Sequence, residues 1–250
     1  MLHKEGKSKE SAKYLKIAND ESLKYKKSDL SLKIKHTEYY RSLKIKNSKN
    51  KYLENASNYI FIVGMPRSGS TLLENILSLN PEVIDMGEVN FLEESIKETK
   101  DFEDVYDLYQ KKVINQFQSS IIYTDKNLFN YIYCPIISNF FPNAKIINCI
   151  RNPLDNILSI YRANFLKQSF SFSLTDISIL YLNYFETMEE YKIKYGKNIY
   201  DYYYEDLIEN PNNIIPEIIS WLDWDWDEKY LSPHQNKRNC LLYTSDAADD

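Results

Sequence analysis

The sequence predicts an α/β protein with a doubly wound parallel sheet flanked by helices and a helical segment at its N-terminus. Three observations carry this prediction. Short apolar runs, such as residues 59–63 and 145–150, alternate with longer segments of helical periodicity. Such alternation is typical of parallel sheets whose strands are joined by helices. The chain is 250 residues long, which is enough for one sizeable core, and a Gly-bounded turn follows the first apolar run.

The elements follow from the periodicity of the apolar residues. Strands are expected near residues 59–63, 83–85, 120–123, 145–150 and 198–203. Helices are expected near residues 70–79, 89–98, 102–118, 128–139, 153–165, 174–194 and 212–222. In a sheet of this kind the ligand binds at the carboxyl ends of the strands. Residues that directly follow a strand are therefore the first candidates for a functional site.

The N-terminal segment, residues 1–51, differs from the rest of the chain in charge. It holds 15 Lys and Arg residues against 6 Asp and Glu residues, whereas the whole chain has a net charge of −5. A basic arm can indicate a nucleic-acid or membrane partner. The helical spacing of Tyr14, Leu15 and Ala18 instead favours a solvated helical scaffold. We therefore predict no nucleic-acid partner and no membrane partner for this segment.

Composition indicates a soluble protein of the cytoplasm. No run of about 18 apolar residues occurs. The Lys-rich N-terminus lacks the apolar core of a signal peptide. Cys134, Cys149 and Cys240 show no metal-ligand spacing and are too few for a disulfide framework. A cytoplasmic location and the absence of a metal site are the expectations.

The most informative motif is Gly-Met-Pro-Arg-Ser-Gly-Ser-Thr, residues 64–71, between an apolar strand and a helix. Backbone N–H groups in such a turn can cradle a phosphate. The spacing is that of the nucleotide-binding loop GxxxxGK[ST], so the sheet is expected to be P-loop-like. Ser70 occupies the position of the loop lysine, and a cation appears earlier as Arg67. The loop thus predicts a phosphate-like ligand, without transfer of a γ-phosphoryl group.

Three further strand ends carry polar residues. Arg151 ends the strand near 145–150, Lys126 follows the strand near 120–123, and Glu88 follows the strand near 83–85. Ser159 lies about two turns into the helix that follows Arg151. The residues alone also allow simpler interpretations. Arg151 could pair with a surface carboxylate, and Ser159 could be a helix residue without a special role. Lys126 could be a solvated loop lysine, and Glu88 could be an acid in the first turn of a helix, where the macrodipole favours it.

The segment Pro66–Leu72 resembles the 5′-phosphosulfate loop of sulfotransferases that use 3′-phosphoadenosine 5′-phosphosulfate (PAPS). Residues 59–222 are similar to the branch that contains tyrosylprotein sulfotransferases and bacterial tetratricopeptide-linked sulfotransferases. The resemblance implies that PAPS is the co-substrate. It implies that its 3′-phosphate is held by Arg151 and Ser159, and that its 5′-phosphosulfate is held by Arg67, Ser68, Gly69, Ser70 and Thr71.

The resemblance also implies the catalytic residues. Lys126 would contact the oxygen that bridges sulfur and the departing nucleotide, and Glu88 matches the catalytic Glu of the tyrosylprotein branch. Other branches use a His, but the three histidines, His3, His36 and His234, stand in no motif context. The implied reaction is in-line sulfuryl transfer without a metal. The implied partner is an acceptor hydroxyl on a protein tyrosine, a sugar or a small alcohol.

The resemblance further suggests a domain organisation. Residues 1–51 look like the end of a tetratricopeptide array, although no complete repeat is visible. Residues 58–239 form the expected sulfotransferase domain. Residues 240–250 resemble translated sequencing adapter, with an ordinary acidic tail as the other interpretation. In the adapter interpretation the native sequence stops near residue 239 and the domain is truncated. Members of the family usually carry another basic nucleotide-binding segment past this point, so the truncated chain is expected to be impaired.

Two other classes of function stay open on the sequence. The first is a P-loop kinase or NTPase, which would need the loop lysine and a Mg²⁺-holding Asp. The second is a non-catalytic helical-repeat interaction protein with a degenerate nucleotide-binding fold. Glu88 and Lys126 argue against the second. Neither the acceptor nor the oligomeric state follows from the sequence.

Overall fold

A five-stranded parallel sheet forms the centre of the computed structural model, which describes residues 6–45, 58–165 and 167–233. The strand order is β2-β3-β1-β4-β5. The strands are β1 (Asn58–Gly64), β2 (Val83–Asp85), β3 (Ile122–Asp125), β4 (Lys145–Ile150) and β5 (Ile199–Tyr203). Each lies within two residues of its predicted position. The predicted α/β fold with a parallel sheet and N-terminal helices is confirmed.

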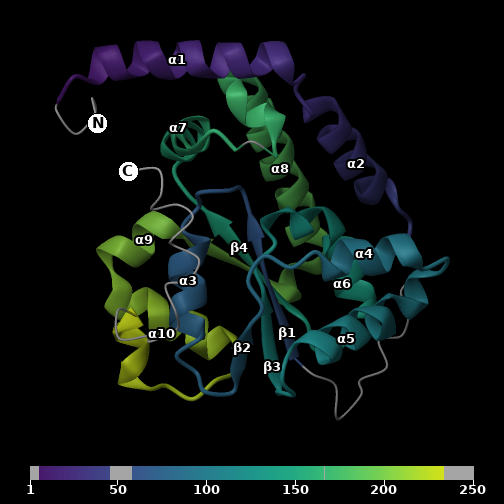
Figure 1. Cartoon of the computed structure of the whole chain (residues 1–250). Helices are drawn as coiled ribbons and strands as arrows, with labels where there is room; N and C mark the ends of the chain where they lie inside the picture. Colours follow the sequence, from purple (N-terminus) through teal and green to yellow (C-terminus); the bar gives the residue numbers. More distant parts are fainter. Residues whose placement is uncertain (1–5, 46–57, 166, 234–250) are drawn as a thin grey trace.

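Helices cover both faces of the sheet (Figure 1). One face carries α3, α9 and α10, and the other carries α5, α6 and α8. The helices are α1 (Ser8–Tyr25), α2 (Leu30–Ser42), α3 (Ser70–Leu77), α4 (Phe91–Glu98), α5 (Val105–Gln116), α6 (Cys134–Phe140), α7 (Pro153–Ala163), α8 (Leu174–Tyr195), α9 (Tyr204–Glu209) and α10 (Pro211–Trp221). The connection from β1 to β2 runs through α3 on the first face, and the later connections run through α5, α6 and α8 on the second face. Helices on both faces are typical of a doubly wound sheet.

Several helix ends differ from the sequence prediction. The helix expected at 102–118 begins with a 3₁₀ turn, Phe102–Asp104, and the helix expected at 128–139 begins with a longer one, Leu128–Tyr133. The helix expected to reach residue 165 ends at Ala163, because Asn164 is left-handed with φ 48°. Asparagine is one of the few residues that adopts this conformation readily.

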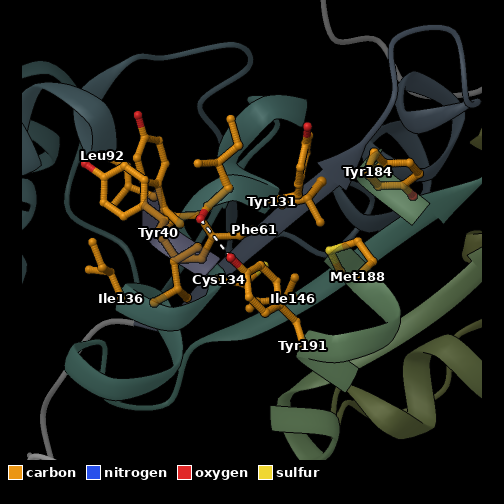
Figure 2. Packing of buried hydrophobic residues seen from close by; sticks show 14 of the residues in the cluster. Tyr40, Phe61, Leu92, Tyr131, Cys134, Ile136, Ile146, Tyr184, Met188 and Tyr191 are labelled. Carbon is orange, nitrogen blue, oxygen red and sulfur yellow. Dashed lines mark hydrogen bonds between the residues drawn. The ribbon is translucent and has the colours of Figure 1, made fainter. Parts of the chain in front are cut away.

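The central strand, β1, is buried on both of its faces. Tyr59, Phe61 and Val63 point into the larger apolar cluster, and Ile60 and Ile62 point into the smaller one. This division follows from the two-residue period of a strand. Figure 2 shows part of the larger cluster, and the residues labelled there come from α2, β1, α4, α6, β4 and α8 and from the turn before α6. A strand of apolar residues without polar alternation is typical of a parallel sheet covered by two helix layers.

The N-terminal helices share the core of the sheet domain. Tyr40 of α2 is 7% exposed and belongs to the larger cluster (Figure 2). Asn19 of α1 is fully buried, and its Nδ2 donates to the backbone oxygen of Tyr161, 3.1 Å away on α7. The Asp29 carboxylate, just before α2, accepts from the backbone N of Phe170 at 2.7 Å. The predicted helical segment is therefore packed against the domain and is not an independent arm.

Some predictions fall on residues that the structure does not describe. The boundary between the two predicted domains, near residues 46–57, is one of them. Residues 234–250, which include the predicted end of the sulfotransferase domain and the adapter-like segment 240–250, also lie outside the described residues. The link to a tetratricopeptide array stays a prediction. In the described ranges, no helix has the length and hydropathy needed to cross a bilayer.

Candidate active site

The carboxyl ends of four strands, β1 to β4, meet at the candidate site. β1 lies between β3 and β4, with parallel pairing on both sides. Strands β3 and β2 lie on one side of β1 in the sheet, and β4 and β5 lie on the other side. The order of the strands therefore reverses at β1, which is where open α/β sheets bind ligands. A cavity of about 880 Å³ opens at these strand ends. Its wall contains six of the predicted site residues: Arg67, Gly69, Ser70, Thr71, Glu88 and Arg151.

Two glycines set the shape of the loop after β1. Gly64 has φ 145°, and a Cβ there would lie 2.6 Å from the Cys149 oxygen of β4. Gly69 has φ 89°, and a Cβ there would lie 2.2 Å from Cδ2 of Tyr204. Both positions combine a backbone conformation that favours glycine with a close neighbour. The two glycines of the motif are therefore explained by the geometry of the turn.

The carbonyl groups of the loop are held by α7 and by the residue after β4. Nδ2 of Asn156 donates to the Pro66 oxygen at 2.8 Å, and Nη1 of Arg151 donates to the Arg67 oxygen at 3.0 Å. Helix α3 begins at Ser70, so the N–H groups of its first turn have no partner within the helix. Such N–H groups, at the positive end of the helix dipole, favour an anion.

Two buried donors beside the loop lack a partner. Neither Oγ of Ser68 nor Nε of Arg151 forms a hydrogen bond with any described residue. Buried polar groups in folded proteins are almost always hydrogen-bonded. A phosphate at the start of α3 would supply acceptor oxygens for such donors.

Two arginines and a serine converge on one side of the loop. Nε of Arg67 donates to Oγ of Ser159 at 3.3 Å, while Arg151 binds the backbone of Arg67. The Arg151 guanidinium also lies 5.0 Å from the ring centroid of Tyr204. The structure therefore brings Arg67, Arg151 and Ser159 together, although Ser159 contacts Arg67 and lies outside the cavity wall.

Lys126 and Glu88 meet at the next strand ends. Because β2 pairs in parallel with β3, the Lys126 backbone N donates to the Gly87 oxygen at 2.9 Å. Nζ of Lys126 then lies 3.4 Å from Oε1 of Glu88 and 3.3 Å from Oε2 of Glu74. Lys126 is 8% exposed and does not line the cavity. Glu88 stands in a loop, since α4 begins only at Phe91. The helix expected at residues 89–98 thus starts two residues later than predicted, and the interpretation of Glu88 as an acid of its first turn is wrong.

A buried carboxyl fixes the loop that carries Lys126. Asp125 is fully buried, and its Oδ2 accepts a hydrogen bond from the Tyr109 hydroxyl at 2.9 Å. Its Oδ1 accepts from Nδ2 of Asn130 at 3.1 Å and from the backbone N of Asn127 at 3.0 Å. Burial raises the pKa of Asp125 to about 7, and the hydrogen bonds oppose this rise. The network orients the chain directly before Lys126.

Four residues of the site were not identified from the sequence. Glu74 follows Ser70 by one helical turn, which is a weak signal. Tyr204 begins α9 directly after β5, where it contacts Gly69 and lines the cavity. Lys33 and His36 of α2 line the other half of the cavity, and no local pattern places them there.

The half of the cavity away from the loop mixes aromatic and charged groups. His36 lies edge-on to Tyr133, with ring centroids 5.7 Å apart. Burial lowers the pKa of His36, so this side chain is neutral at neutral pH. Nζ of Lys33 lies 4.0 Å from the ring centroid of Phe129. This half, with Ile132 and Phe165 also in its wall, can receive an organic molecule whose hydroxyl faces Glu88.

The arrangement suits group transfer from an anionic donor. One end of the cavity offers N–H groups and guanidinium groups to phosphates, and the Glu88 carboxylate in its wall is paired with the Lys126 ammonium. Among the described residues, no group of three or more His, Cys, Asp or Glu side chains could hold a metal ion.

Comparison with known proteins gives a family. A sequence model described as the sulfotransferase family matches residues 59–228. An uncharacterised protein of Aquifex aeolicus is 28% identical over 206 residues, covering 72% of this chain and 27% of the relative. Protein-tyrosine sulfotransferase A of Caenorhabditis elegans is 27% identical over 209 residues, covering 72% and 53%. A putative protein-tyrosine sulfotransferase of Caenorhabditis briggsae is 23% identical over 206 residues, covering 73% and 71%.

Solved structures share the fold. The sulfotransferase domain of the Synechococcus PCC 7002 olefin synthase has a TM-score of 0.55 at 20% identity, covering 78% of this chain and 82% of that one. The sulfotransferase domain of the curacin biosynthetic pathway has a TM-score of 0.55 at 18% identity, covering 74% and 80%. The chain spans 27% of the length of the Aquifex relative and 53% of the C. elegans relative, so those proteins contain further sequence.

Proposed function

The chain belongs to the sulfotransferase family, and we propose that it transfers a sulfuryl group from PAPS to an acceptor hydroxyl. The observation that carries the proposal is the convergence of four strand ends on one cavity. The loop after β1 and Arg151 after β4 form an anion site, and Glu88 after β2 stands beside Lys126 after β3. These are the groups that sulfuryl transfer needs: a phosphate cradle, a base and a cation for the leaving group.

The residues present fit the phosphates of PAPS. The start of α3, with Ser70 and Thr71, would hold the 5′-phosphosulfate, together with the buried and unpaired Oγ of Ser68. Arg151 would hold the 3′-phosphate, since its Nε is unpaired and a guanidinium can donate two hydrogen bonds to one phosphate. Ser159 would complete this second site, and Nε of Arg67, the arginine expected at the 5′-phosphosulfate, already donates to its Oγ at 3.3 Å.

The transfer step assigns one task to each catalytic residue. The acceptor oxygen forms a bond to sulfur as the bond from sulfur to the 5′-phosphate oxygen breaks. Glu88 takes the proton of the acceptor hydroxyl. The electron pair of the broken bond stays on the phosphate oxygen, and Lys126 stabilises the charge that develops there. The other product is 3′-phosphoadenosine 5′-phosphate (PAP).

The structure disfavours a kinase or NTPase. A P-loop enzyme holds Mg²⁺ with an Asp at the end of a strand beside the loop strand. Asp125 occupies such a place, at the end of β3 next to β1. It is fully buried, and its oxygens already accept hydrogen bonds from Tyr109, Asn127 and Asn130. With Ser70 in place of the loop lysine, both requirements of that class are unmet at these positions.

The acceptor would enter through the half of the cavity lined by α2 and by aromatic residues. We favour a protein tyrosine, because two nematode relatives carry the name protein-tyrosine sulfotransferase. A sugar hydroxyl and a small alcohol are the other candidates for this proposal. The aromatic side chains Phe129, Tyr133 and Phe165 could pack against a phenol ring.

Calorimetric titration of PAP, ADP and Mg-ATP tests the proposal. PAP is expected to bind most tightly, because ADP lacks the 3′-phosphate. Arg151→Ala should weaken PAP binding by about 10- to 150-fold, the equivalent of a charged hydrogen-bonded contact of about 1.5–3 kcal/mol. Arg162→Ala, an exposed arginine on α7, is the matched control and should bind PAP normally. A preference for Mg-ATP over PAP would refute the proposal.

A further inference from the structure

Lys126 has two carboxyl partners with different surroundings. Oε2 of Glu74 lies 3.3 Å from Nζ, and Oε1 of Glu88 lies 3.4 Å from it. The Glu74 side chain is 5% exposed, whereas the Glu88 side chain is 73% exposed. A buried side chain has little freedom to leave its partner, while an exposed one can exchange the contact for water or a ligand. The two carboxyl groups are therefore not equivalent.

Glu74 connects the lysine to the phosphate loop. It lies on α3, one turn after Ser70, and α3 continues directly from the loop that ends at Gly69. The contact between Glu74 and Lys126 thus sets the position of the ammonium relative to the helix N-terminus. Lys126 is otherwise tethered through its backbone N to the Gly87 oxygen at 2.9 Å, which does not fix its long side chain.

We propose that Glu74 is a positioning residue for sulfuryl transfer, which holds the Lys126 ammonium in place while Glu88 leaves it to bind the acceptor hydroxyl. This inference rests on the proposed function. In the free protein both carboxyl groups hold the ammonium. When the acceptor enters, Glu88 turns to its hydroxyl and takes its proton as the new S–O bond forms. Glu74 keeps Nζ where the leaving phosphate oxygen develops its charge.

The charge state of Glu74 suits this task. Burial raises the pKa of Glu74 to about 9; Lys126 opposes the rise, and the nearby Asp85 of β2 adds to it. Cys149 of β4 also faces Glu74, and burial raises the pKa of its thiol, so it stays neutral. A neutral Glu74 accepts a hydrogen bond from Lys126 without cancelling its positive charge. Ionised Glu74, above pH about 9, would draw the ammonium away from the leaving oxygen.

Substitutions at Glu74 separate positioning from a structural role. Glu74→Gln keeps an oxygen acceptor without a charge, and Glu74→Leu removes the acceptor while filling the same buried space. Glu217→Gln, on the exposed face of α10, is the matched surface control. The readouts are PAP affinity by calorimetry and release of PAP from PAPS with water as acceptor, measured from pH 6 to pH 10. Water replaces the unidentified acceptor, so no acceptor has to be known.

The expected pattern is a loss of turnover without a loss of binding. Glu74→Leu should lower PAP release by about tenfold or more, with PAP affinity within about twofold of wild type. Glu74→Gln should retain turnover at pH 7 and should lack the decline that wild type shows as pH rises through about 9.

Failure of this inference can be told from failure of the proposed function. Wild-type protein that does not bind PAP would overturn both. Wild-type protein that binds PAP, with Glu74→Leu releasing PAP at the wild-type rate, would overturn the positioning role alone. Equal losses in Glu74→Gln and Glu74→Leu would also overturn it, because rescue by the amide is required.

Discussion

Gly69 offers the sharpest test of the loop geometry. Its φ of 89° is one that L-residues adopt at a cost of about 1–2 kcal/mol. A Cβ at this position would lie 2.2 Å from Cδ2 of Tyr204, so the ring must retreat by about 1.2 Å to reach an ordinary contact of 3.4 Å. Crowding of this kind costs about 1–3 kcal/mol in addition. Gly69→Ala should therefore destabilise the protein by about 2–5 kcal/mol.

Gly87→Ala is the matched control for the backbone cost. Gly87 has φ 63°, and a Cβ there meets no described atom within 4 Å. This variant should lower the midpoint of thermal unfolding by about 2–4 °C for a cost of about 1 kcal/mol. Gly69→Ala should lower it by at least twice as much as the control does. It should also weaken PAP binding by about tenfold or more, because the Tyr204 ring also contacts Arg151.

Removal of the ring should relieve the crowding. In the double variant Gly69→Ala with Tyr204→Ala, the loss of stability should be smaller than the sum of the two single losses, with a coupling of about 1–3 kcal/mol. Differential scanning fluorimetry and PAP titration measure both quantities. Equal unfolding midpoints and equal PAP affinities for Gly69→Ala and Gly87→Ala would refute the reasoning about this loop.

Three further predictions concern other parts of the site. Lys33→Met should raise the KM for the acceptor and leave PAP affinity within about twofold, since Lys33 lines the half of the cavity away from the loop. Lys35→Met, at an exposed position of the same helix, is the control and should change neither quantity. A loss of PAP affinity in the Lys33 variant would contradict the assignment. Asn156→Ala should lower the free energy of unfolding by about 1–3 kcal/mol and weaken PAP binding, because the buried Pro66 oxygen loses its donor. Unfolding in urea measures the loss of stability, and an unchanged midpoint would contradict the role of Asn156 in holding the loop. Burial raises the pKa of Asp125 to about 7, so the folded state holds this proton more tightly than the unfolded state. The contribution of Asp125 to the free energy of unfolding should therefore fall as pH rises from about 4 to 7, by up to about 1.4 kcal/mol per pH unit. Urea unfolding of wild type and Asp125→Asn measures this slope as the difference between their free energies of unfolding, and a difference that does not change with pH would contradict the prediction.

The local pattern was enough to find the loop and the strand ends. An apolar run followed by a Gly-bounded turn fixes where β1 ends and α3 begins, and Arg151 directly follows the apolar run of β4. These features depend on neighbours in sequence only. The family match over residues 59–228 agrees with the resemblance drawn from the loop.

Contacts between distant segments were beyond the sequence. The meeting of Glu88 and Lys126 depends on the pairing of β2 with β3, which no periodicity reveals. Tyr204 reaches Gly69 only because β5 lies next to β4 and delivers the start of α9 to the loop. Lys33 enters the cavity because α2 packs through Tyr40 into the core of the sheet domain, and the sequence of α2 gives no sign of the segment against which it packs.

The most direct test of the central claim follows the sulfuryl group itself. Protein incubated with ³⁵S-labelled PAPS would be offered a tyrosine-containing peptide, an oligosaccharide and a small alcohol, each in parallel with γ-³²P-labelled Mg-ATP. We predict that ³⁵S appears in one acceptor and that Glu88→Gln lowers the rate by about 10²–10⁴-fold while PAP still binds. Transfer of ³²P with no transfer of ³⁵S, or full activity in Glu88→Gln, would contradict the assignment of sulfuryl transfer to this site.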